Sequence, residues 1–242
     1  MARKSNNIVR GTLGPVIHYE WKGKQCMRSM PKKFERTEAS VKSGLNFGKA
    51  SSLSREMRQD IAYVNPCKKD NTVMFRFTGV LNQFLNWKTK NAPVVDGILT
   101  DLPFISNFQF NDQCDLTNIP SLKVSAAIDE PGLLNVTQLP FDPQKTLGAH
   151  HFANQAILKL ILIAGNLDTG ISEISDTATF NFPTDVIFQP PVQPMKTSKG
   201  TNELVILVRA IQYSTGDVAM GRAEMITDIT KLPCAIVWAY CS

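Results

Sequence analysis

The run "TNELVILVRAIQYS" at residues 201–214 decides the fold class, because a long apolar segment rich in Val and Ile is typical of a buried strand. Two comparable runs are "QAILKLILIAG" at residues 155–165 and "CAIVWAYC" at residues 234–241. No helical periodicity separates these runs, which favours an antiparallel sandwich over a parallel α/β sheet. We therefore predict a mostly β fold in which residues 93–242 form an antiparallel β-sandwich domain.

Three shorter segments bounded by Pro, Gly, Asn and Asp are further strand candidates: "SLKVSAAID" (121–129), "LLNVTQLPF" (133–141) and "TATFNF" (177–182). The Pro-rich segment "QPPVQPMKTSKG", residues 189–200, predicts an exposed loop between strands. The strand-like runs are expected to bury a common sandwich core that includes Leu160, Leu162, Val205, Leu207, Ile236 and Trp238.

Residues 36–92 predict a helical hairpin. Apolar side chains four or eight residues apart indicate one helix face over residues 37–64, at Val41, Leu45, Leu53, Met57 and Ile61. A second helix is expected over residues 71–88, with one face formed by Met74, Phe77, Leu81, Phe84 and Leu85. The short connection favours an antiparallel pair, packed through Leu53, Met57, Phe77, Leu81 and Phe84.

Residues 1–35 predict a basic tail followed by a β-hairpin arm. In "GTLGPVIHYEWKGKQCMRSMPKK", residues 11–33, apolar and polar residues alternate loosely up to a Lys22-Gly23 turn, and residues 25–30 return as the partner strand. An isolated two-stranded hairpin is marginal in water. We therefore expect this arm to pack on its own body or on a neighbouring chain.

Charge is distributed unevenly along the chain. Residues 1–69 hold 15 Lys and Arg against 5 Asp and Glu, whereas the remainder holds 11 against 16. This asymmetry favours either a polyanionic partner or attraction between the arm of one subunit and the body of another. The candidate partner-binding residues of the arm are Arg3, Lys4, Arg10, Tyr19, Trp21, Lys22, Lys24, Arg28, Lys32, Lys33 and Arg36.

Motifs of catalysis or cofactor binding are missing from the sequence. It contains no G-x-S-x-G, H-E-x-x-H or P-loop pattern. His150 and His151 are adjacent, so a strand would point them to opposite faces, away from a common metal. The cysteines are odd in number, widely spaced and without a C-x-x-C pair, which favours free thiols in a reducing compartment: Cys26, Cys67, Cys114, Cys234 and Cys241. We expect no enzyme activity, cofactor, metal site or disulfide framework.

Membrane insertion is not expected either. No segment approaches the ~20 apolar residues that a membrane-spanning helix needs, and the N-terminus lacks the apolar region of a secretory signal. These features favour synthesis in the cytoplasm, with later release in a particle as an open route.

The opening of the chain resembles a family of uncharacterised proteins from Bacteroidota. The resemblance covers roughly residues 1–90 and rests on a Gly-x-x-Gly, aromatic, Gly-Lys, Arg and Pro signature, matched here by Gly11, Gly14, Tyr19, Gly23, Lys24, Arg28 and Pro31. A helix with small residues follows that signature. The resemblance implies no established activity.

Four functions fit these observations. The leading one is a self-assembling structural protein, a subunit of a virion, tail-like particle or filament, whose basic N-terminal arm docks on another copy. The alternatives are a nucleic-acid-binding protein that uses the basic aromatic arm, a non-assembling binding module that uses sandwich loops such as residues 189–200, and an enzyme of unrecognised type.

Overall fold

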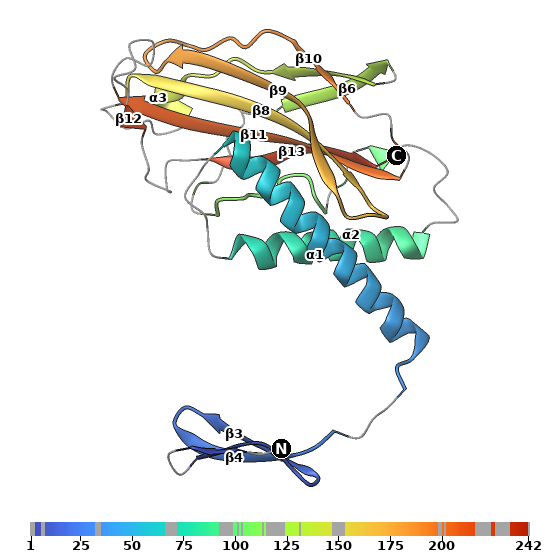
Figure 1. Cartoon of the computed structure of the whole chain (residues 1–242). Helices are drawn as coiled ribbons and strands as arrows, with labels where there is room; N and C mark the ends of the chain where they lie inside the picture. The colour runs from blue at the N-terminus through green and yellow to red at the C-terminus, as the bar shows by residue number, and fades with distance from the viewer. Residues whose placement is uncertain are drawn as a thin grey trace. The chain divides into compact units, whose positions relative to one another are not determined.

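The computed structural model of the 242-residue chain forms two compact units, Met1–Val41 and Lys42–Ser242 (Figure 1). The residues that it describes are 3–5, 8–31, 35–65, 72–91, 99–100, 102, 104–112, 114, 124–130, 132–146, 153–197, 200, 202–215, 224–225 and 233–241. The sequence predicted three regions, with the helices apart from the β-region. In the structure the helices share the second unit with the β-region.

Two antiparallel sheets form the β-part of the second unit, and the prediction of a mostly β fold is confirmed. The larger sheet has the strand order β5-β13-β11-β8-β9, with β12 paired to β11. Its strands are β5 (Leu99–Thr100), β8 (Gln155–Asn166), β9 (Ser172–Pro183), β11 (Glu203–Thr215), β12 (Glu224–Met225) and β13 (Cys234–Cys241). The smaller sheet has the order β10-β7-β6, from β10 (Gln193–Lys196), β7 (Leu133–Gln138) and β6 (Val124–Glu130), and a short helix α3 (Pro143–Thr146) follows β7.

The strands β8, β11 and β13 of the larger sheet are buried on both faces, and this explains why they are nearly continuously apolar. Successive side chains of a strand point to opposite faces. On β11, Leu204 and Ile206 therefore join a cluster with the helices, while Val205 and Leu207 join a cluster with the smaller sheet. A strand covered on both sides needs apolar residues at every position rather than at every second one.

The sandwich core matches the prediction at four of the six named positions. Leu160, Leu162, Val205 and Leu207 are buried between the two sheets. Ile236 is also buried, but it lies in the cluster on the helix side, because β13 places it on the other face of the sheet. Trp238 is half-buried at the edge of the sandwich cluster.

The segment predicted as an exposed loop contains strand β10, and that prediction is wrong for residues 193–196. β10 pairs with β7 in the register Pro194↔Asn135, and Met195 is fully buried in the sandwich core. A proline is tolerated there because β10 is an edge strand, which leaves one side of its backbone without a ladder.

Two long helices cover the other face of the larger sheet, α1 (Glu38–Val64) and α2 (Val73–Asn91), close to the predicted ranges. Thr37 caps α1, since its Oγ1 accepts a hydrogen bond from the Ser40 amide at 3.2 Å. The predicted apolar face of α1 is correct only in its second half, where Leu53, Met57 and Ile61 are buried.

Val41 and Leu45 are exposed, and helix geometry gives the reason. A helix turns about 100° per residue, so a stripe with four-residue spacing drifts around the axis and rotates by about 200° between Val41 and Ile61. On α2 the residues of the predicted apolar face are buried except Met74, which is exposed. Its neighbour Val73 is buried instead.

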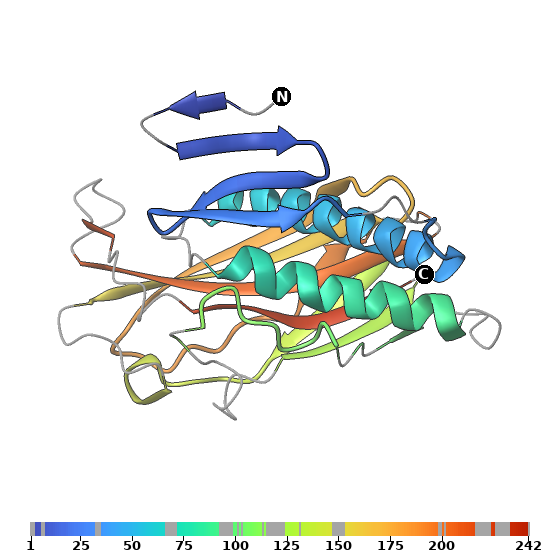
Figure 2. The ribbon, with the colours of Figure 1, turned by 90° about the horizontal axis from the view of Figure 1, so that it is seen from below.

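The helices pack on the sheet as well as on each other. All five side chains predicted to join them lie in one buried cluster with residues of the larger sheet: Leu53, Met57, Phe77, Leu81 and Phe84. Asn46 of α1 also bonds directly to α2: its Nδ2 donates to Asn86 Oδ1 at 2.9 Å and to Thr89 Oγ1 at 3.4 Å. Figure 2 shows α1 and α2 side by side along the same face of the sheet.

Two side chains of α1 pack directly on Gly165 of β8. A Cβ added at Gly165 would lie 2.5 Å from both Leu53 Cδ1 and Met57 Cε. The sheet also anchors the C-terminal end of α1, because Lys159 Nζ donates a hydrogen bond to the Val64 carbonyl at 2.7 Å. A cation at a helix C-terminus is favourable, which explains why a lysine interrupts the apolar run of β8.

Candidate functional site

The N-terminal unit contains a four-stranded antiparallel sheet in the order β1-β2-β3-β4. Its strands are β1 (Arg3–Ser5), β2 (Ile8–Leu13), β3 (Val16–Trp21) and β4 (Lys24–Ser29). The predicted hairpin is present as β3 and β4, and its turn has φ values of 50° at Lys22 and 75° at Gly23, as a tight hairpin turn requires. β1 and β2 extend the hairpin into a sheet, which the sequence did not predict.

Strand β2 changes partner at Gly11. Residues Gly11–Leu13 pair with β3, whereas residues 8–10 pair with β1. Gly11 has φ 112°, a backbone conformation open to glycine and rare for other residues. Val9 lies beyond the ladder with β3, and its backbone bonds to the Gln25 side chain instead. The Gln25 Oε1 accepts from the Val9 amide at 2.9 Å, and the Nε2 donates to the Val9 carbonyl at 2.8 Å.

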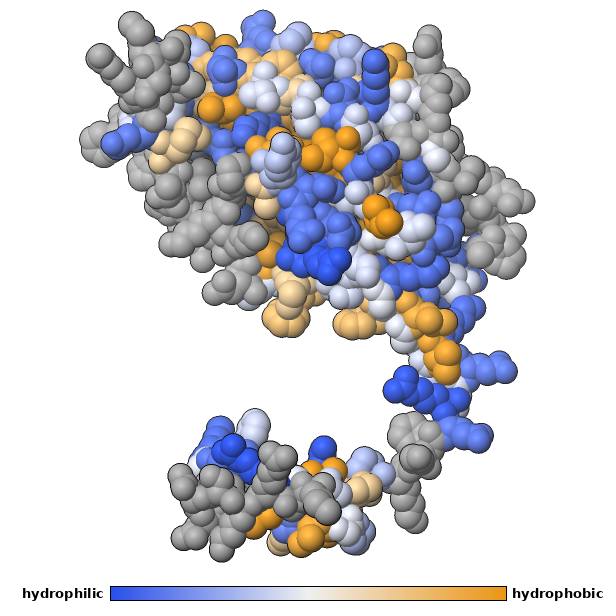
Figure 3. Space-filling view, viewed as in Figure 1, coloured by the Kyte–Doolittle hydropathy of each residue, from blue (hydrophilic) through white to orange (hydrophobic). Residues whose placement is uncertain are grey.

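None of the side chains described between residues 9 and 31 is buried. Large apolar groups are among the most exposed: Leu13 at 63%, Trp21 at 60% and Met27 at 68%. Figure 3 shows hydrophobic side chains reaching the surface of this sheet between hydrophilic ones. A sheet normally gains its stability by burying an apolar face, so this one offers apolar surface for binding.

One side of the sheet, here called the aromatic face, carries Ile17, Tyr19 and Trp21 of β3. The strand register places Arg28, Cys26 and Lys24 of β4 directly opposite these three residues, and directly opposed residues share a face. The Arg28 guanidinium lies 6.0 Å from the centre of the Tyr19 ring. Ile17, Tyr19, Trp21 and Arg28 line an open cavity of about 590 Å³.

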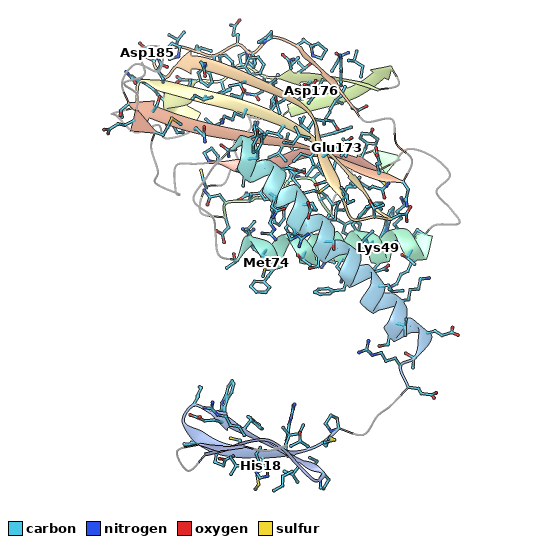
Figure 4. The ribbon with its side chains drawn as sticks, in the orientation of Figure 1. His18, Lys49, Met74, Glu173, Asp176 and Asp185 are labelled. Carbon is cyan, nitrogen blue, oxygen red and sulfur yellow. The ribbon has the colours of Figure 1, made fainter. Side chains whose placement is uncertain are left out.

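The other side, here called the methionine face, carries Leu13, Val16, His18 and Met27. Leu13 lies opposite Val16, and His18 lies opposite Met27. Side chains project from both sides of the sheet in Figure 4, where His18 is labelled. Glu20 belongs to the methionine face by its alternation along β3, and its carboxylate forms an ion pair with Arg10.

The structure brings together four of the predicted partner-binding residues, Tyr19, Trp21, Lys24 and Arg28, on the aromatic face. Lys22 lies in the adjoining turn, Arg10 pairs with Glu20, and Arg36 is exposed just before α1. Arg3 and Lys4 belong to β1, while Lys32 and Lys33 lie outside the described residues. The sequence did not single out Ile17 as a site residue, although alternation along β3 places it beside Tyr19.

In the second unit, a group of polar side chains joins the helices to one end of strands β8, β11 and β13. Lys88 Nζ donates to Asn202 Oδ1 at 2.8 Å and lies 3.0 Å from Cys241 Sγ. Asn202 Nδ2 donates to Asp168 Oδ2 at 2.6 Å, and Lys49 forms an ion pair with Asp168 at 3.4 Å. The hydrogen bond from Asn202, with a smaller contribution from Lys49, lowers the pKa of Asp168. These contacts fasten α1 and α2 to the β8–β9 connection.

Within the described ranges, no group of three or more His, Cys, Asp or Glu residues could hold a metal ion. No disulfide joins the described cysteines, which are Cys26, Cys114, Cys234 and Cys241, whereas Cys67, His150 and His151 lie outside those ranges. In the part of the chain that the structure describes, neither long helix carries enough apolar residues to cross a bilayer.

Comparison of the chain with protein-family models, curated proteins and solved structures finds no match. The resemblance of the first 90 residues to Bacteroidota proteins therefore stays a prediction. The candidate site is defined by its own geometry, an exposed sheet with an aromatic, basic face and an apolar one.

Proposed function

We propose that this chain is a self-assembling structural protein, a subunit of a virion, tail-like particle or filament. In this proposal the methionine face of the N-terminal sheet docks on a neighbouring copy. The observation that carries it is a four-stranded sheet in which no side chain described between residues 9 and 31 is buried.

Burial of the methionine face supplies the driving force. Leu13 and Met27 are more than half exposed, and covering such a side chain contributes about 1.5–3 kcal/mol. The sheet also has two open edges, β1 and β4, whose free backbone groups can pair with another chain. Both features favour an obligate neighbour over an isolated hairpin.

The second unit offers apolar positions that could receive the sheet of another copy. Leu45 and Phe47 on α1 and Met74 and Phe75 on α2 are large, apolar and exposed. Met74 is labelled on α2 in Figure 4. Exposed apolar groups on helices that already have a buried face mark candidate interaction sites, so we assign the receiving surface to this helix layer.

Charge supports association between copies as well. The acidic remainder of the chain includes the exposed Glu173 on β9 and Asp185 just after it, both labelled in Figure 4. Residues 3–29 hold six Lys and Arg against one Glu, and this positive charge would favour approach of the N-terminal sheet to a copy whose residues 70–242 are acidic. Synthesis in the cytoplasm with later release in a particle belongs to the same proposal.

Light scattering on the purified full-length protein tests this function. We expect a mass of several subunits, and a fall to the monomer mass in the double variant Leu13→Ser/Met27→Ser. The matched control is Tyr19→Ser on the aromatic face, which should keep the assembled mass. A second variant that lacks residues 1–35 keeps the Thr37 cap of α1 and should also be monomeric.

Two results would contradict the proposal. One is a monomeric full-length protein over the whole accessible concentration range. The other is an unchanged mass in both variants together with lower thermal stability, which would mean that the sheet packs on its own chain.

A further inference from the structure

We propose that the aromatic face of the N-terminal sheet binds single-stranded nucleic acid. Bases stack on Tyr19 and Trp21, and phosphates are contacted by Lys24 and Arg28. This inference does not rest on the proposed assembly, since it concerns the opposite side of the sheet.

The spacing of the two aromatic rings suits an unstacked strand. Tyr19 and Trp21 are two residues apart on β3, so their Cα atoms are about 6.8 Å apart along the strand. That is about twice the rise of 3.4 Å per nucleotide within one strand of B-DNA. Successive bases can occupy these rings only when they are pulled apart, which a single strand allows and a duplex does not.

The cations of this face are available to phosphates. Neither Lys24 nor Arg28 forms an ion pair in the described part of the chain. The single carboxylate of strands β1–β4, that of Glu20, belongs to the other face and pairs with Arg10. The Arg28 guanidinium lies 6.0 Å from the centre of the Tyr19 ring, so a cation and an aromatic ring are adjacent on this face.

The face is also hollow enough to receive flat groups. The cavity lined by Ile17, Tyr19, Trp21 and Arg28 has a volume of about 590 Å³, within the roughly 300–1,000 Å³ typical of small-ligand sites. Apolar walls with cations beside them match a nucleotide, which joins an aromatic base to an anionic phosphate.

A polyanion fits this face better than a protein does. The centre of a protein interface is normally depleted in lysine, and here Lys24 lies directly opposite Trp21. A protein partner would have to bring carboxylates to both Lys24 and Arg28. A nucleic-acid strand supplies one negative charge with each base.

The test uses fluorescence anisotropy of the full-length protein with labelled oligo-dT and oligo-rU of about 15 nucleotides, the upper range of single-strand sites, and with a duplex of equal length. We expect tighter binding of the single strands. Trp21→Ala and Tyr19→Ala should each weaken binding roughly 5- to 150-fold. Tyr63→Ala is the control, because Tyr63 is an aromatic side chain of α1 that is 86% exposed and lies outside the N-terminal sheet.

Two further variants separate stacking from charge. Trp21→Phe should keep most of the affinity, because an aromatic ring remains, and should remove the quenching of Trp21 fluorescence on binding. Lys24→Gln should reduce the slope of log K against log salt by about 0.7, the contribution of one phosphate contact on a single strand. Equal binding of oligo-dT and oligo-rU would support the proposal and would mean that the 2′-hydroxyl is not recognised. Tighter binding of one of them would support the proposal for that type of nucleic acid, DNA or RNA.

Three outcomes would overturn the proposal. In the first, Trp21→Ala weakens binding no more than Tyr63→Ala does. In the second, the duplex binds at least as tightly as the single strands at the same salt concentration. In the third, no oligonucleotide binds and Trp21→Ala instead changes the mass in light scattering, which would make the aromatic face a protein contact.

Discussion

The N-terminal sheet and the central strands β8, β11 and β13 of the larger sheet are both antiparallel, yet they differ in burial at most positions. On β11, eleven consecutive residues from Leu204 to Ser214 are buried, whereas no described residue of β3 is buried. The larger sheet lies between a helix layer and a second sheet, so both of its faces are core. Continuous apolar strands therefore belong to the core of this molecule, and the alternating strand β3 with its exposed aromatic residues belongs to the sheet for which we propose binding.

The largest expected effect compares the two sheets directly. Leu207→Ala removes a fully buried side chain from the sandwich core and should lower the free energy of unfolding by about 2–5 kcal/mol. Leu13→Ala removes the same groups from an exposed position and should change the free energy of unfolding by less than about 0.5 kcal/mol. Urea titration followed by circular dichroism, at a protein concentration where no assembly forms, measures both. Equal losses at the two positions would contradict the distinction between a structural and a binding sheet.

A second comparison uses two glycines. Gly165→Ala puts a methyl group 2.5 Å from Leu53 and Met57, and such overpacking should destabilise the protein by about 1–3 kcal/mol. Gly79→Ala, on the exposed side of α2, meets nothing within 4 Å and should stabilise it by about 0.5–1 kcal/mol, since alanine is the better helix former. The same urea titration distinguishes the two signs. A stabilising Gly165→Ala would mean that α1 is not seated closely on β8.

The sequence was sufficient to predict elements whose periodicity is unambiguous. β8, β11 and β13 were identified within one or two residues because both of their faces are buried, and α2 because four of its five named apolar residues lie on one face. The sequence could not tell that the two helices would share one layer on the sheet. That arrangement depends on contacts between segments far apart along the chain, such as that of Gly165 on β8 with Leu53 and Met57 on α1.

The errors have local physical causes. Residues 193–196 resemble a loop because of their prolines, but an edge strand accepts proline, and Met195 supplies the burial. In the candidate site, the hairpin and its aromatic residues could be predicted from alternation and the Lys22-Gly23 turn. The change of partner strand at Gly11 could not be predicted in this way. Neither could the hydrogen bonds between the Gln25 side chain and the Val9 backbone, which join positions 16 residues apart.

A third prediction concerns the lysine inside the apolar run of β8. Lys159→Met keeps the aliphatic chain but removes the donor to the Val64 carbonyl at the end of α1. We expect a loss of about 1–2 kcal/mol, the usual consequence of leaving a partly buried acceptor without its partner. Lys196→Met, at an exposed position of β10, is the control and should have little effect. If both variants were equally stable, Lys159 would not anchor α1 to the sheet.

The smallest expected effect at neutral pH tests whether water reaches the buried side chains of the larger sheet. Tyr213 of β11 is 2% exposed, and its hydroxyl has no hydrogen-bond partner in the described part of the chain. Burial, together with a smaller influence of Cys114, raises the pKa of Tyr213. Tyr213→Phe should therefore leave the stability at pH 7 unchanged or raise it by up to about 1 kcal/mol, because an unsatisfied polar group is removed.

The pH dependence of the same variant gives the sharper result. In the unfolded chain a tyrosine loses its proton near pH 10, whereas the folded protein keeps the Tyr213 proton to higher pH because its pKa is raised. The folded state then binds more protons, so the stability that this group contributes is complete below about pH 10 and falls as the pH rises above it. At pH 11 wild type should have lost about 1 kcal/mol more than Tyr213→Phe, relative to pH 8. Parallel losses in the two proteins would mean that water reaches the Tyr213 hydroxyl, and that the larger sheet is less well sealed than its burial implies.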